Sequence, residues 1–205
     1  MTLVKATYHH KDLRNALIEE TLAVLAEGGF ATLTLRELAR RLGVTHAAPY
    51  AHFADKRALL EAVAIVGFER LAEALEPIRA TNLPAETKIV EMSRAYLRFA
   101  QAQPNLYRLM FVAHEITEDR ECVGLQEAGQ RAIATLIDTI AELESARSDD
   151  AADLQDKAMA AWALVHGAAM LTIDERTALK SERSPDEIVQ MAAAIFVKGL
   201  GASKG

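Results

Sequence analysis

The most informative stretch of the sequence is LTLRELARRLGVTHAAPYAHFADKR, residues 33–57. Its hydroxyl, imidazole and cationic side chains could bind a polar partner. Thr34 and Glu37 have the Ser/Thr-x-x-Glu spacing in which a hydroxyl and a carboxylate cap the backbone N–H groups of a helix start. Gly43 stands where that helix must stop and turn, a position that favours a residue able to adopt positive φ. Thr45 can cap a second short helix. Two short helices joined by a tight glycine turn are suited to placing the second helix in the major groove of DNA.

The flanking segments predict a three-helix unit around this turn. The apolar residues of the first short helix share one face at helical spacing: Leu35, Leu38, Ala39 and Leu42. The second short helix is expected to run to about Phe53, and Asp55 can then cap a long third helix. Before the turn, an amphipathic helix is expected from Leu13 to Glu27, because Gly28-Gly29 is a stop signal.

An ordered series of features spans residues 13 to 60: a helical start at Leu13 to Gly29, an aromatic at Phe30, the segment Thr34 to Gly43, the element Tyr50-Ala51-His52-Phe53, and Lys56. This series resembles the DNA-binding domain of the TetR/AcrR family of transcriptional repressors. Pro49 departs from the family pattern, which usually has Leu or Ile there. With Thr45 as N-cap, Pro49 is the fourth helical residue and loses only the first internal hydrogen bond. We therefore expect a mild kink and a partly 3₁₀ recognition helix.

The resemblance implies DNA contacts that divide between bases and backbone. Residues at the start of the second short helix are expected to face base edges: Thr45, His46 and Ala47, with Ala48 adding an apolar contact. Hydroxyl, imidazole and cationic side chains are expected to hold the phosphate backbone: Thr34, Arg36, Tyr50, His52 and Lys56. Tyr50 could instead be mostly a packing residue. Phe53 is expected to pack inward, and Arg40 and Arg41 are assigned to surface salt bridges or solvation.

A dimer is expected because one short helix covers only a few base pairs, so useful specificity needs two half-sites. A two-fold dimer would place its recognition helices in successive major grooves, roughly 34–36 Å apart. The expected partners are double-stranded operator DNA, a second copy of this chain and a small-molecule effector, with no membrane among them.

The charge of the chain supports DNA binding only at one end. Residues 1–57 hold eight Lys or Arg and six Asp or Glu, a net +2, whereas the remainder holds fifteen and twenty-three, a net −8; together these give the overall −6. Such an asymmetry can be ordinary solvation of helix surfaces. Beside a helix-turn-helix, a basic head on an acidic body is what phosphate binding by one end needs.

Composition predicts an all-α protein of the cytoplasm. The 205 residues are 51% hydrophobic with only 5 prolines, and β-branched runs are short, which favours helices. The single cysteine, Cys122, excludes an internal disulfide framework and a thiolate metal cluster and fits a reducing compartment. No apolar run approaches the ~18 residues of a membrane span, and the N-terminus lacks the apolar core of a secretion signal.

Stop and start signals predict about nine helices in two domains. The DNA-binding headpiece is expected over residues 1–54, and a ligand-sensing and dimerisation domain over 55–205. Helices of the second domain are expected from Asp55 to about Glu76 with Pro77 closing it, Asn82 to about Ala102, Gln103 to Val112, Cys122 to Ser145, Asp150 to Ile173 and Ser184 to about Gly199. The last of these has a capping box, with Ser184 at N-cap, Pro185 at N1 and Glu187 at N3.

The segment WALVHGAAML, residues 162–171, resembles the C-terminal domain of a TetR subgroup marked by Trp, His and Gly, here Trp162, His166 and Gly167. Trp162 and His166 are four residues apart and share a helix face. Gly167 inside a helix costs about 1 kcal/mol relative to Ala and usually signals the close approach of another helix. We expect this helix and the one from Ser184 to Gly199 to form the dimer interface as a four-helix bundle.

Several aromatic, Met and His side chains of the second domain are candidates to line an effector cavity: Tyr96, Phe99, Tyr107, Met110, Phe111, His114, Trp162, His166 and Met170. Each could equally be a core residue, since aromatic and Met side chains at helical spacing commonly fill cores. His114 or His166 as a metal ligand is the weaker alternative; the sequence HEITE is not H-E-x-x-H, so a zinc protease site is excluded and neither a metal nor a cofactor is expected.

These expectations combine into a two-state repressor, in which a ligand shifts the helix from Asp55 to Glu76 and thereby the spacing of the recognition helices. Transcriptional activation, or a helical interaction module without DNA binding, are the alternatives. An enzyme is not expected, because the chain has no G-x-S-x-G elbow, P-loop, Rossmann glycine fingerprint or zinc spacing.

Overall fold

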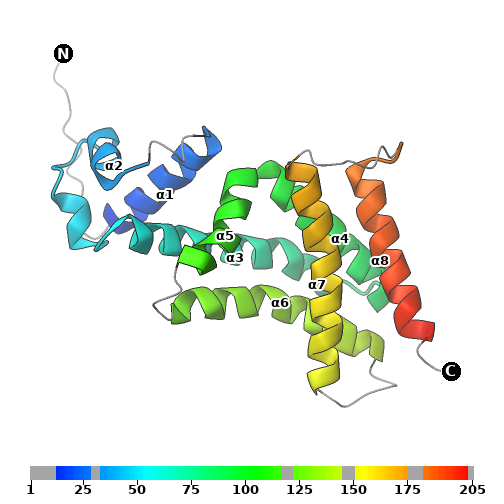
Figure 1. Cartoon of the computed structure of the whole chain (residues 1–205). Helices are drawn as coiled ribbons and strands as arrows, with labels where there is room; N and C mark the ends of the chain where they lie inside the picture. The colour runs from blue at the N-terminus through cyan, green and yellow to red at the C-terminus, as the bar shows by residue number, and fades with distance from the viewer. Residues whose placement is uncertain (1–12, 29–32, 117–121, 145–150, 175–181, 203–205) are drawn as a thin grey trace.

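The structure, a computed structural model, describes residues 13–28, 33–116, 122–144, 151–174 and 182–202. Within these ranges the chain forms eight α-helices, one 3₁₀ helix and no strand, which confirms the all-helical prediction. The elements, drawn in Figure 1, are α1 (Leu13–Ala26), α2 (Leu35–Arg41), η2 (Ala48–Ala51), α3 (Lys56–Arg79), α4 (Ala85–Ala102), α5 (Pro104–Ile116), α6 (Val123–Glu144), α7 (Ala151–Ile173) and α8 (Pro185–Ala202).

The headpiece, formed by α1, α2 and η2, contains the predicted turn. Thr34 has extended backbone (φ −139°, ψ 153°), and its side chain accepts a hydrogen bond from the N–H of Glu37 at 3.1 Å. Gly43, at the turn, has φ +67°, which only a residue without a Cβ adopts at no cost. The predicted cap and the predicted glycine turn are therefore both confirmed.

The second helix of the turn has the 3₁₀ form expected from Pro49, but it is shorter than predicted. Only Ala48–Ala51 is helical, in the 3₁₀ form, and its N-cap is Ala47 with no side-chain cap, so the predicted cap at Thr45 is wrong. Pro49 accounts for the difference, because it has no N–H to donate and it disfavours α conformation in the preceding residue. The backbone bonds from Ala48 N to Thr45 O (3.0 Å) and from Tyr50 N to Ala47 O (3.2 Å) accordingly span three residues.

Helix α3 joins the headpiece to the rest of the molecule without a break. Its cap is the predicted one, since the Oδ1 of Asp55 accepts from the N–H of Ala58 at 2.8 Å. The predicted end at about Glu76 is wrong, because the helix continues past Pro77 to Arg79. Pro77 lies in the last turn, where it removes one hydrogen bond, and the N–H of Ala80 still reaches the carbonyl of Glu76 at 3.0 Å. Helix α5 likewise runs beyond the predicted Val112 to Ile116.

The remaining helices form the body. Helix α3 packs against α5 and α6, and α4 packs against α7 and α8. In Figure 1, α6 runs along α3, and α7 crosses α6. Helix α8 starts with the predicted capping box, in which Ser184 N donates to Glu187 Oε2 at 2.7 Å and Glu187 N donates to Ser184 Oγ at 3.3 Å. No helix in the described ranges combines the length and the apolar character that crossing a membrane requires.

One apolar core runs from the headpiece into the body. Leu17 and Leu38 of the headpiece, Leu59 of α3 and Tyr107 of α5 are all fully buried members of it. A second, smaller cluster joins α4, α6 and α7 around Ile89, Ile140, Ala158 and Ala161. Because the first core is continuous, a movement in the body can reach the headpiece through packed side chains.

Candidate functional site

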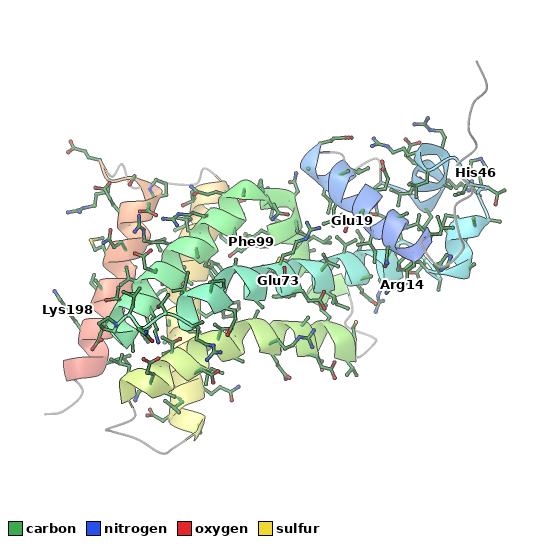
Figure 2. The ribbon with its side chains drawn as sticks, turned by 180° about the vertical axis from the view of Figure 1, so that it is seen from behind. Arg14, Glu19, His46, Glu73, Phe99 and Lys198 are labelled. Carbon is green, nitrogen blue, oxygen red and sulfur yellow. The ribbon has the colours of Figure 1, made fainter. Side chains whose placement is uncertain are left out.

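The outer surface of the headpiece presents the residues predicted to face DNA bases. Thr45, His46 and Ala47 are exposed, and Figure 2 shows His46 at the end of the molecule opposite Lys198. The side chain of Tyr50, on η2, is 51% exposed, so it lies at this surface rather than in the core. Ala48, beside it, is half-buried.

The arginines at the end of α2 are held by carboxylates. Arg40 donates to both carboxylate oxygens of Glu37, at 2.6 and 2.8 Å, and Arg41 bonds to Glu27 at 3.1 Å and to Glu20 at 3.3 Å. The hydrogen bonds from Arg40, followed by that from Arg41, lower the pKa of Glu37 from 4.5 to about 2. Arg40 and Arg41 are thus in the surface salt bridges assigned to them.

The predicted phosphate-binding residues lie around η2 and the starts of α2 and α3. Thr34 and Arg36 are exposed, and Lys56 is half-buried at the first position of α3. His52 is also half-buried, and its Nε2 is buried without a hydrogen-bond partner among the described residues. A phosphate contact by His52 would therefore use Nδ1 or follow a side-chain rotation. DNA contact by these residues remains a prediction.

Phe53 packs inward, as expected. Its ring is buried, and the guanidinium of Arg14 on α1 lies 5.3 Å from the ring centroid. This cation–π contact holds the end of the recognition segment against α1. The exposed surface from Thr45 to Tyr50 is consequently supported from behind by the headpiece core.

A cavity of about 480 Å³ lies in the body between α3, α4, α5, α6 and α7. Its volume falls within the roughly 300–1,000 Å³ typical of small-molecule sites. The walls are mainly apolar, and no charged side chain is found among the described residues that line it. The exposed lining residues belong to α6 and α7, so the mouth lies between these helices: Gln126, Gln130, Gln155 and Met159.

The structure brings three of the predicted ligand-binding residues to the cavity wall: Tyr96, Phe111 and Trp162. Five others lie elsewhere in the body and do not line it: Phe99, Tyr107, Met110, His166 and Met170. Phe99, Tyr107 and Met110 are buried in the core, the packing role that was the alternative for each. The side chain of His114 lies outside the described part of the structure.

A triangle of polar atoms adjoins the cavity wall. It is formed by Tyr96, which lines the cavity, and by Tyr107 and His166, which do not. The hydroxyl of Tyr107 lies 3.0 Å from that of Tyr96 and 2.8 Å from the Nδ1 of His166, and the Tyr96 hydroxyl lies 3.1 Å from the same Nδ1. The Nε1–H of Trp162 donates to the Tyr96 oxygen at 3.2 Å. Sequence spacing indicated that Trp162 and His166 share a face, and their ring centroids are 5.0 Å apart.

Burial sets the protonation of this triangle. It raises the pKa of Tyr96 to about 12, and it also raises the pKa of Tyr107. It lowers the pKa of His166 below its usual 6.5. Near neutral pH both tyrosines therefore keep their protons and the imidazole is uncharged.

Sequence reasoning missed most of the cavity wall. Phe68, Leu71 and Leu75 of α3 line it, as do Ser93 of α4 and the polar residues of the mouth. One signal for the mouth was available: Gln126 and Gln130 are four residues apart and flank Gly129, so they place amides on one face of α6. The α3 residues carried no distinguishing signal, because their spacing is that of any buried helix face.

Two contacts fix helix α5 against its neighbours, one in the headpiece and one in the body. The amide of Asn105, at the start of α5, donates to the carbonyl of Leu25 in α1 at 2.8 Å. Gly67 of α3 lies against α5 so closely that an added Cβ would be 2.7 Å from Cγ of Met110. Helix α5, which lines the cavity through Phe111, is therefore fitted against both α1 and α3.

An apolar face of α7 and α8 is exposed. Leu164 and Leu171 of α7 are about half exposed, and Met191 and Ile195 of α8 are 43% and 61% exposed. No described atom lies within 4 Å of a Cβ built on Gly167, so the close helix approach expected there does not occur within the subunit. Within the described ranges, no group of three or more His, Cys, Asp or Glu side chains is arranged to hold a metal ion.

Two family models match the chain. Residues 17–63 match the model described as bacterial regulatory proteins, tetR family, and residues 89–196 match the one described as tetracyclin repressor-like, C-terminal domain. The tetracycline repressor protein class C of Escherichia coli is 51% identical over 51 residues, which cover 25% of this chain and 23% of that protein. The chain thus matches this curated relative over about a quarter of its length.

Solved structures share the fold over almost the whole chain. A Rhodococcus sp. RHA1 protein with unknown function is 32% identical, with 95% of this chain and 98% of that chain covered and a TM-score of 0.79. The TetR family transcriptional regulator PfmR from Thermus thermophilus has a TM-score of 0.64 at 16% identity, with 90% and 98% covered. The second likeness concerns the fold alone.

Proposed function

This chain belongs to the TetR family of bacterial regulatory proteins, and from that premise we propose that it is a transcriptional repressor. Its dimer binds a palindromic operator and releases it when a small hydrophobic or amphipathic effector fills the cavity. Residues 1–54 act as the DNA-binding domain, and residues 55–205 sense the effector and dimerise. In this proposal the protein is a regulator and not an enzyme, and it acts in the cytoplasm, where the bacterial DNA is.

The headpiece supports the DNA-binding part of this proposal. Thr45, His46, Ala47 and Tyr50 are exposed on the helix-turn-helix, and Arg36 adds an exposed cation nearby in sequence. Because η2 is only 4 residues long and begins after Ala47, we assign the direct base contacts to the exposed residues before it, Thr45, His46 and Ala47. The operator is then read in part by shape and by phosphate contacts.

The exposed apolar face of α7 and α8 supports the dimer. Leu164, Leu171, Met191 and Ile195 form a set of large apolar side chains that a monomer would leave in water. A second copy packing its own α7 and α8 against them would make a four-helix bundle. The open space at Gly167 would then admit a helix of the partner. The contact of Trp162 with His166 also motivates assignment of the chain to the Trp-His-Gly subgroup.

The observation that carries the proposal is the course of α3. This one helix starts at Lys56, directly after the recognition segment, and lines the cavity with Phe68, Leu71 and Leu75. Roughly 18 Å of helix separates Lys56 from Phe68. A ligand that pushes on these three side chains shifts α3, and with it the spacing of the two recognition elements of the dimer.

The size of the effect follows from the differential affinity of the effector for the two states. A coupling free energy of about 1–3 kcal/mol would weaken operator binding roughly 5- to 150-fold. Helix α5 can contribute, because it touches the cavity through Phe111 and the headpiece through Asn105.

Selection of random duplex DNA by the purified full chain tests the proposal. The control is the double variant Tyr50→Ala, Lys56→Ala, which removes two predicted phosphate contacts and leaves the cavity unchanged. We expect the wild type to enrich an inverted repeat and the double variant to enrich none. An absence of enrichment by a folded, dimeric wild type would contradict the proposal.

A further inference from the structure

The chemistry of the effector can be narrowed from the polar atoms that reach the cavity, an inference that rests on the proposed function. The described wall has no charged side chain and is mainly apolar. Its polar groups are Ser93, Tyr96, Trp162 and the amides at the mouth. Ser93 and Trp162 already use their protons within the protein: Ser93 Oγ donates to the carbonyl of Ile89 at 2.8 Å, and Trp162 Nε1 donates to Tyr96. Deep in the cavity, Tyr96 is the remaining source of a proton for a ligand.

The triangle that adjoins the wall decides whether that proton is free. Tyr107 does not line the cavity and is fully buried, so its proton must stay inside the triangle. When Tyr107 donates to Nδ1 of His166, over the shortest edge of 2.8 Å, the single lone pair of that nitrogen is occupied. Tyr96 can then donate either to the oxygen of Tyr107, 3.0 Å away, or to a ligand oxygen in the cavity that it lines.

With the His166 proton on Nε2, Tyr107 can instead donate to Tyr96 while Tyr96 donates to Nδ1 over 3.1 Å, and a ligand oxygen then competes with that nitrogen for the Tyr96 proton. The other tautomer of His166 leaves the Tyr96 proton without an acceptor in the triangle. With a proton on Nδ1, His166 donates to Tyr107, and Tyr107 donates to Tyr96 over 3.0 Å. In each of these arrangements the oxygen of Tyr96 accepts from Trp162, so a hydrogen bond between Tyr96 and a ligand uses the Tyr96 proton. Because Tyr96 keeps that proton near neutral pH, it acts as a donor and not as an anion.

We propose that the effector is an uncharged, mostly apolar molecule whose carbonyl-type oxygen accepts a hydrogen bond from the hydroxyl of Tyr96. A charged ligand would lose its hydration without gaining an opposite charge from any described wall residue. A hydrocarbon has no acceptor, so it would form no hydrogen bond with the Tyr96 hydroxyl. Tyr107 and His166 are positioning residues, since they aim the Tyr96 proton without touching the ligand.

Matched naphthalene probes test this chemistry in the full-length dimer without DNA: acetonaphthone (a neutral ketone), ethylnaphthalene (no acceptor), naphthoate (an anion) and naphthylmethylammonium (a cation). The readout is the fluorescence of Trp162, the single tryptophan of the chain, which lies in the cavity wall. Calorimetry provides an independent affinity. We expect both neutral probes to bind and both ions to bind more weakly than the ketone.

The variant Tyr96→Phe removes only the hydroxyl. It should weaken acetonaphthone roughly 3- to 10-fold, the value of one neutral hydrogen bond, and change ethylnaphthalene by less than about twofold. Tyr107→Phe should weaken acetonaphthone by a smaller factor, because the proton of Tyr96 then turns to His166. Phe111→Leu, a change in the apolar wall, should weaken both neutral probes alike. Retained binding of ethylnaphthalene shows that each variant is folded.

Three results would overturn the inference: an equal effect of Tyr96→Phe on the ketone and the hydrocarbon, tighter binding of either ion than of the ketone, or no binding of any probe to the wild type. None of these results bears on whether the headpiece binds an operator. The DNA selection described above therefore tests the proposed function separately.

Discussion

The headpiece and the cavity differ in how exposed their candidate binding side chains are and in how many elements supply them. The exposed headpiece residues Thr45, His46, Ala47 and Tyr50 come from one short run of the chain. The cavity is uncharged among its described walls, and it takes its side chains from five helices between Phe68 and Val165. Reading phosphates and base edges requires groups that face water, whereas binding an apolar effector requires groups removed from it. Helix α3 begins at Lys56, soon after the exposed headpiece residues, and lines the cavity through Phe68, which is why we propose it as the physical link between them.

The largest expected effect concerns the proposed dimer, because binding of a palindromic operator uses two headpieces. The double change Leu164→Glu, Ile195→Glu puts two carboxylates on the exposed apolar face of α7 and α8. Buried unpaired charges prevent association, so sedimentation should show a monomer, and operator affinity should fall by on the order of 100-fold or more because one half-site is lost. Gln101→Glu on the exposed side of α4 is the control. A dimer that survives the double change would refute this interface.

A smaller effect separates the two kinds of arginine on α2. Arg36 is exposed and predicted to bind phosphate, whereas Arg40 is paired with Glu37. Replacing Arg36 with Ala should reduce the slope of log affinity against log salt by about 1, the value for one phosphate contact. Arg40→Ala should leave the slope almost unchanged, and neither variant should alter binding of acetonaphthone. Equal slopes for both variants would contradict the assignment.

The close packing of α3 on α5 gives a third prediction. Gly67→Ala would place a Cβ 2.7 Å from Cγ of the fully buried Met110. Overpacking costs about 1–3 kcal/mol, and the helix propensity of Ala returns about 1 kcal/mol, so the free energy of unfolding should fall by about 1 kcal/mol. Gly129→Ala, where nothing lies within 4 Å, should instead raise it. Denaturant unfolding measures both, and a stabilised Gly67→Ala would show that α5 yields easily.

Acid should affect the two regions in separate pH ranges. The pKa of His166 is lowered in the fold, so the unfolded chain takes up its proton first and stability declines as pH falls below about 6.5. The pKa of Glu37 is lowered from 4.5 to about 2, so its contribution is complete above pH 4.5 and is lost as pH falls toward 2. Thermal unfolding of His166→Gln should lack the first decline, and that of Glu37→Gln the second. Identical profiles for the two variants would contradict this division.

The sequence predicted the features that depend on near neighbours. The caps at Thr34, Asp55 and Ser184 are local hydrogen bonds within four residues, and each forms as expected. The positive φ of Gly43 is also a property of one residue in its turn. The effect of Pro49 is predictable in kind, since a partly 3₁₀ helix was expected, but not in extent, because the N-cap lies at Ala47 and not at Thr45.

The cavity was predicted only in part, because its lining depends on how helices meet. Tyr96 and Tyr107 are the same residue type on adjacent helices, yet only Tyr96 reaches the cavity. Their difference depends on the packing angle of α4 and α5, which hydrophobic spacing does not encode. The exposed glutamines of the mouth were missed because a polar residue at a helix surface is ordinary until the neighbouring helix is known.

The most direct test of the account is the affinity of acetonaphthone for the full-length dimer with and without the selected operator duplex, read from Trp162 fluorescence. If α3 links the two regions, each ligand must weaken the other by the same factor. The account predicts that saturating operator weakens the probe roughly 5- to 150-fold, and that Tyr50→Ala, Lys56→Ala removes this effect at the same DNA concentration. An unchanged probe affinity on an operator-bound wild type would contradict it.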